Sequence, residues 1–117
     1  MIGKVLWLVV AAAFIRPAAA ETCLIFDTPA TVQGKVAAVE DYWILQVPKP
    51  LCVDSPPGDD LGTPAHNVQD IQLVFKDTLA AKPFTDQNVT VSGHLSPPHG
   101  NFNKRPVILE VETVKKQ

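Results

Sequence analysis

Residues 89–95 (VTVSGHL) place a glycine in the middle of a strand pattern, and residues 31–40 (TVQGKVAAVE) repeat the arrangement. Both stretches contain the unit Val-x-Gly-x-Val/Leu, with apolar residues at every second position. A strand alternates its side chains between two faces, so each stretch buries one face of a sheet. Glycine inside a strand is typical of a sharp bend or a bulge, as at the corner of a small barrel. The two stretches therefore predict bent strands in a mostly β protein.

Three further stretches favour strands because they are rich in branched and aromatic residues. They are residues 42–47 (YWILQV), 68–75 (VQDIQLVF) and 107–114 (VILEVETV). Residues 77–86 (DTLAAKPFTD) predict one short helix, with Asp77 as its cap and Pro83 limiting it to one or two turns. Residues 48–67 and 96–106 are rich in turn formers and predict loops.

This order of elements indicates the fold class. Five strands, with one short helix between strands three and four, predict a small five-stranded OB-like Greek-key barrel over residues 21–117. A small β-sandwich built from the same strands is the alternative. The residues expected to point inward are Val32, Gly34, Val36, Ala38, Trp43, Leu45, Val47, Ile71, Leu73, Phe75, Val89, Val91, Gly93, Leu95, Val107, Leu109 and Val111.

The N-terminal segment predicts export. Lys4 precedes 11 apolar residues at 5–15, which is short against the about 20 that a membrane-spanning helix needs. Ala18 and Ala20 form the small-x-small pattern of a signal peptide, so cleavage is expected after Ala20. An uncleaved anchor, or a lipoprotein attached at Cys23, is the alternative. We expect a periplasmic or secreted protein with no stable membrane anchor after cleavage.

Composition and charge favour one folded domain and argue against a nucleic-acid-binding protein. The chain has 117 residues with 46% hydrophobic content, which suits one folded domain. Removing Lys4 and Arg16 from 10 basic residues leaves 8 against 12 acidic ones, a net charge of −4. Such a charge argues against a nucleic-acid partner. Export favours a disulfide between the two cysteines, Cys23 and Cys52, over two free thiols.

Residues 88–114 resemble an exported bacterial family known as domain of unknown function 4431. In that family a V-x-V-x-G-x-L strand precedes a histidine-containing loop and a second apolar strand. The matching residues are Val89, Val91, Gly93, Leu95, His99, Pro106, Val107, Leu109 and Val111, with Cys52 and the strand 71–74 upstream. The resemblance implies an OB-like exported domain and no particular activity. Gly100, Asn101 and Phe102 replace the consecutive histidines found there, so no metal role carries over.

The loop at residues 96–106 (SPPHGNFNKRP) is the candidate binding loop. It is locally basic within an acidic protein, and it carries an aromatic residue. OB folds bind oligosaccharides or oligonucleotides on the face of strands two and three and through the loop between strands four and five. Tyr42 and Ile44, expected on the outer side of strand two, extend this surface. The candidate binding residues of the loop are His99, Asn101, Phe102, Lys104 and Arg105.

Other candidate sites are weaker. His94 and His99, with a carboxylate such as Asp86, have ligand types for a transition metal, but their spacing does not require one. The acidic pairs at 40–41 and 59–60 are more typical of turns than of a glycosidase. The acidic stretch 54–61 lacks the full EF-hand pattern of a calcium loop.

Three functional hypotheses follow. The first is an exported, non-enzymatic OB-like module without cofactors that binds a protein or an envelope polysaccharide through residues 96–106. The second is a small periplasmic ligand- or cation-binding stress sensor. The third is a small hydrolase, which requires two carboxylates, or a histidine and a carboxylate, to meet in a pocket.

Overall fold

The computed structural model describes residues 22–58, 63–100 and 103–117, and the side chains at 78 and 79 are not among those described. Over these residues the protein is mostly β, with six strands hydrogen-bonded in one sheet. The elements are β1 (Leu24–Ile25), β2 (Pro29–Val39), β3 (Tyr42–Asp54), β4 (Ala65–Val74), the 3₁₀ helix η2 (Thr78–Phe84), β5 (Asn88–Ser96) and β6 (Ile108–Lys116). The predicted signal peptide, with Ala18 and Ala20, lies outside the described residues. Within the described ranges, no helix has the length and apolar character required to cross a membrane.

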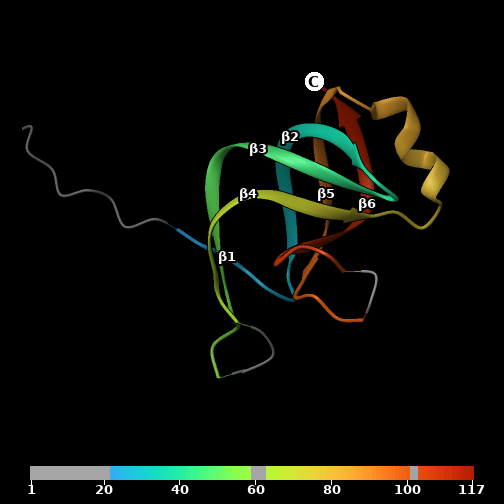
Figure 1. Cartoon of the computed structure of the whole chain (residues 1–117). Helices are drawn as coiled ribbons and strands as arrows, with labels where there is room; N and C mark the ends of the chain where they lie inside the picture. Colours follow the sequence, from blue (N-terminus) through green and yellow to red (C-terminus); the bar gives the residue numbers. More distant parts are fainter. Residues whose placement is uncertain (1–21, 59–62, 101–102) are drawn as a thin grey trace, which may run out of the picture.

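The longer strands pair with one another in a ring (Figure 1). β3 pairs antiparallel with both β2 and β4, and β4 pairs parallel with β6. β6 pairs antiparallel with β5, which in turn pairs antiparallel with β2. The five longer strands are therefore linked in a closed cycle of pairings.

Gly34 and Gly93 lie where the backbone of a neighbouring strand leaves no room for a side chain. A Cβ atom on Gly93 would overlap the carbonyl oxygen of Glu110, and one on Gly34 would overlap that of Gln46. The register between β5 and β6 also shifts between Ser92 and Gly93, which marks a bulge. The predicted bend or bulge at the strand glycine is thus confirmed at Gly93.

The core follows the predicted alternation. The inward-facing apolar residues of β5 and β6 are buried, whereas Glu110 and Glu112 are exposed. Trp43 and Val47 pack against the core beside the fully buried Leu45, as their shared parity predicts. Ala38 was predicted to point inward but is exposed, next to the turn that ends β2. The core cluster consists of Phe26, Val32, Val36, Leu45, Val53, Val68, Ile71, Leu73, Val89, Val91, Leu95, Val107, Leu109 and Val111.

The loop predicted at residues 48–67 is shorter at both ends than expected. β3 continues to Asp54, and β4 begins at Ala65. Pro48 and Pro50 are tolerated because the β2 pairing ends at Gln46 and the β4 register breaks between Gln46 and Leu51. Proline lacks an N–H group, so it fits a strand where no neighbour requires one.

The short helix predicted at residues 77–86 also needs correction, because only a 3₁₀ turn forms there. Ala80 N–H donates to the Asp77 carbonyl at 2.9 Å, and Thr85 N–H donates to that of Lys82 at 3.2 Å. Both bonds join residues three apart, as in a 3₁₀ helix. Pro83 explains the difference, since it has no N–H to donate to the residue four positions earlier.

The disulfide between Cys23 and Cys52 is confirmed. β1 pairs parallel with β3, and Leu24 lies opposite Val53. The two cysteines come just before this pair, with their Cα atoms 4.7 Å apart, which is close to the normal spacing of neighbouring strands. The bond therefore fixes the N-terminal strand to the far end of β3, and it is compatible with an oxidising compartment.

Candidate functional site

The end of the candidate binding loop returns to the outer face of β3 and β4. The Lys104 N–H donates to Oε1 of Gln72, at 2.6 Å, on β4. Earlier in the loop, the His99 N–H donates to Oδ1 of Asn103 at 2.6 Å. The first of these bonds positions the chain at 103–106 across β4, so the loop and the strand face form one surface.

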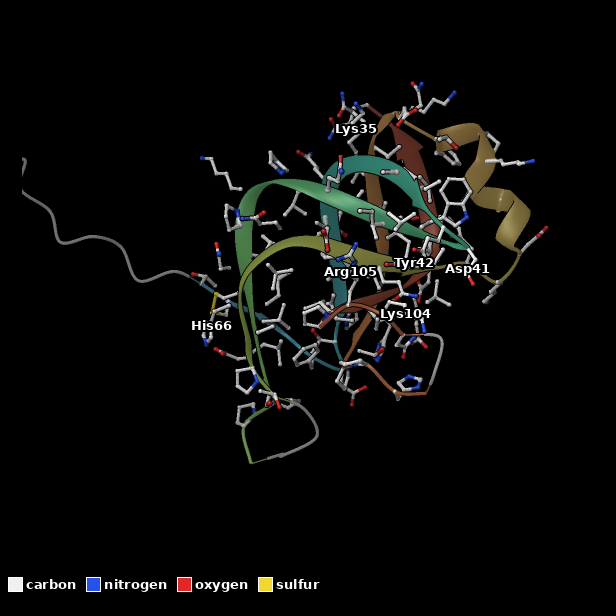
Figure 2. All side chains as sticks on the ribbon, viewed as in Figure 1. Lys35, Asp41, Tyr42, His66, Lys104 and Arg105 are labelled. Atoms are coloured by element: carbon white, nitrogen blue, oxygen red, sulfur yellow. A yellow bond between two sulfur atoms is a disulfide. The ribbon has the colours of Figure 1, made fainter. Side chains whose placement is uncertain are left out.

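Arg105 makes the most specific contacts of this loop (Figure 2). Its Nε atom lies 3.4 Å from Oδ1 of Asp70, which is an ion-pair distance without hydrogen-bond geometry. Its guanidinium carbon lies 5.8 Å from the centre of the Tyr42 ring, within cation–π range. The Arg105 side chain is 30% exposed and that of Asp70 is 29% exposed. Arg105 therefore links β3 and β4 from a partly exposed position.

The structure supports one of the two predicted β3 contributors and corrects the other. Tyr42 contacts Arg105 on the outer face. Ile44 is only 4% exposed, so it offers no ligand surface. It forms a cross-strand row with Gln72 and Ile108, and all three residues are buried. The Lys104 backbone bonds to the middle residue of this row, so the end of the loop meets the row at Gln72.

A shallow hollow adjoins the Arg105 contacts. Its volume is about 410 Å³, and it lies where β3 bends away from β4. Gln46, Gln69 and Asp70 contribute its polar groups, and Val47, Pro48 and Pro50 form the rest. Asp70 is common to the hollow and to the Arg105 pair. The hollow thus offers two carboxamides and a carboxylate, with a guanidinium group beside them.

The predicted loop residues have different outcomes. Lys104 and Arg105 lie on the surface just described, whereas His99 is exposed and bonds to Asn103 through its backbone N–H. Asn101 and Phe102 lie outside the described residues. Asp70 was missed as a site residue, although a signal for it existed. Ile71 points inward, so alternation places Asp70 on the outer face.

The other candidate sites are spread over the molecule. His94 Nε2 lies 2.8 Å from Oδ1 of Asp27. Within the described ranges, no three His, Cys, Asp or Glu residues are grouped in a way that could hold a metal ion. Glu40 and Asp41 form the β2–β3 turn, as expected of turn residues. The pair at 59–60, and with it part of the candidate calcium loop, lies outside the described residues.

No family model, curated protein or solved structure matches this chain.

Proposed function

We propose that this protein is an exported, non-enzymatic OB-like binding module that holds an envelope polysaccharide on the outer face of β3 and β4. The proposed location is periplasmic or secreted, after cleavage of a signal peptide at Ala20. The resemblance to the family of domain 4431 and the confirmed disulfide both support this assignment.

The strand connections support the OB-like barrel. Numbered from β2, the five longer strands pair in the cycle 1-2-3-5-4-1, with the third and fifth parallel. This cycle supports the proposed OB-like Greek-key arrangement. Its second and third strands are then β3 and β4, and the loop between its fourth and fifth strands contains Lys104 and Arg105.

The observation that carries the proposal is the contact of Arg105 with Asp70 and Tyr42 beside a polar hollow. Carboxamide, carboxylate and guanidinium groups supply both donors and acceptors for sugar hydroxyls. The centre of a protein–protein interface is depleted in charged groups. The polar lining therefore favours a glycan over a protein partner on this face.

A titration followed by two-dimensional amide NMR tests the proposal. The full chain, expressed with its own N-terminal segment and recovered after export, is titrated with soluble fragments of bacterial envelope polysaccharide. We expect shifts at Gln46, Gln69, Asp70 and Arg105. Gln33→Ala, an exposed change on β2, serves as the control.

Two variants test whether the glycan binds at the proposed site. Gln69→Ala and Arg105→Ala should each weaken glycan binding about five- to tenfold, because each removes direct hydrogen-bond donors. Unchanged affinity in both variants, or glycan shifts on other strands, would contradict the site. A spectrum that no glycan changes would contradict the proposed ligand class.

A further inference from the structure

The C-terminal half of β6 has a strand partner on one side only. On one side, its pairing with β5 extends to Lys116, opposite Val89. On the other side, the pairing with β4 ends at Glu110, opposite Val74. No other strand in the described part of the chain pairs with β6 beyond that point. Residues 111–116 therefore form an open edge on the side of β6 that faces away from β5.

The backbone at this edge is oriented for pairing. The Gln117 N–H donates to the Asn88 carbonyl at 3.0 Å, on the side of β5. Successive residues of a strand direct their N–H and C=O groups to opposite sides. The groups of Val114 and Lys116 consequently point away from β5, toward the open edge. Unpaired groups of this kind are a template for another strand.

A groove runs along this edge. It consists of two adjoining hollows of about 550 and 330 Å³, which share Phe75, Lys76, Val111 and Glu112. The larger hollow is closed on the far side by Ala80 and Phe84 of η2, which stands beside β6 (Figure 1). Phe75, Phe84, Val111 and Val114 make its lining largely apolar.

The charges around the groove have an acidic excess. Three carboxylates, from Asp77, Glu110 and Glu112, line it together with Lys76 and His94. Nζ of Lys116 lies 6.0 Å from the centre of the Phe84 ring. Glu110 and Glu112 are exposed, and neither is in an ion pair with another described residue. A complementary partner therefore brings apolar side chains to the floor and basic side chains to the rim.

We propose that an extended segment of a partner protein, with alternating apolar and basic residues, adds as a strand to the open edge of β6. Main-chain hydrogen bonds give affinity in this mode, and the alternating side chains give specificity. The segment fits between β6 and η2, where its apolar residues contact Phe75 and Phe84. This surface lies on different residues from the proposed glycan site, and the two proposals are independent.

The first test uses a nine-residue synthetic peptide of alternating lysine and valine. It is titrated into the isotopically labelled full chain, and amide shifts are followed by NMR. We expect the largest shifts at residues 111–116 and 75–76, with those at Gln46 and Asp70 unchanged. Shifts absent from 111–116 would overturn the proposal.

Three matched peptides separate the parts of the interaction. Methylating alternate backbone nitrogens removes strand pairing, replacing lysine with glutamate reverses the charge, and replacing valine with glutamine removes the apolar contact. Each change should weaken binding at least fivefold. Equal binding by the methylated peptide would show that no strand is added, and would overturn the proposal.

A pair of protein variants tests the charge at this edge. Glu112→Gln and Gln33→Lys each raise the net charge by one, but only the first changes the groove. Glu112→Gln should weaken the lysine–valine peptide about two- to fivefold at low salt, and Gln33→Lys should leave it unchanged. Shifts at 111–116 that depend on protein concentration without peptide would instead identify a second copy as the occupant, against the proposal.

Discussion

The outer face of β3 and β4 and the open edge of β6 expose different parts of the same sheet. On the β3–β4 face the strands are paired, so the polar groups exposed there belong to side chains such as Gln46, Asp70 and Arg105. At the β6 edge a neighbouring strand is missing, so backbone groups are available beside an apolar groove. One small sheet therefore exposes polar side chains in one place and unpaired backbone groups in another.

The difference arises from where β4 leaves β6. Up to Val74 the two strands pair, and beyond it the chain turns into η2. η2 is too short and too tightly wound to cover the edge, and a groove remains between it and β6. On the outer face of β3 and β4, by contrast, the loop before β6 folds back onto Gln72.

Removing the disulfide should have the largest effect on stability. Replacing both Cys23 and Cys52 with serine opens a link between residues 29 positions apart, at a cost of about 3 kcal/mol in unfolding free energy. Chemical denaturation of the variant and the oxidised wild type measures this. Amide exchange should rise in β1 and at the end of β3, while residues 111–116 keep their rates. A loss under about 1 kcal/mol would contradict the structural role of the bond.

Gly93→Ala should destabilise the pairing of β5 with β6 more than it affects the β3–β4 face. Its Cβ would overlap the carbonyl oxygen of Glu110, so the two strands must separate. We expect a loss of about 2–3 kcal/mol in thermal or chemical unfolding. Ser92→Ala, which removes only an exposed 3.0 Å contact with Thr31, should cost under about 0.5 kcal/mol. Equal effects of the two changes would refute the close approach at Gly93.

Arg105→Ala should disturb the β3–β4 face and lower the free energy of unfolding by less than Gly93→Ala does. The partly exposed pair with Asp70 and the contact with Tyr42 together contribute about 0.5–1 kcal/mol. Lys104→Ala is the matched control, because its exposed side chain is removed and its N–H bond to Gln72 is kept. If both variants unfold alike, Arg105 does not hold the loop to this face.

The sequence predicted the parts of the fold that depend on alternation. Val89, Val91 and Leu95 point inward as expected, because a period of two is a property of the strand itself. Pro48 and Pro50 misled the prediction, since whether a strand tolerates proline depends on its neighbours' register. β1 was missed because two residues are too few to show a period.

The candidate site was only partly predictable for similar reasons. Arg105 was identified from local charge, but its partner Asp70 is 35 positions away and is brought near by the fold. Ile44 lies on the outer face as predicted, but it is buried, in a row with Gln72, to which the Lys104 backbone bonds. The open edge of β6 depends on where β4 departs, and no residue within β6 encodes that point.

Amide hydrogen exchange along β6 tests the contrast between the closed and open regions most directly. The N–H groups of Thr113 and Lys115 face β5, so their exchange should be slow, whereas those of Val114 and Lys116 should exchange quickly. On the β3–β4 face, successive residues between Trp43 and Leu45 should be protected alike, because both sides of β3 are paired there. Alternating rates in β6 together with uniform protection in β3 is the predicted result. Uniformly slow exchange from 113 to 116 would contradict the open edge.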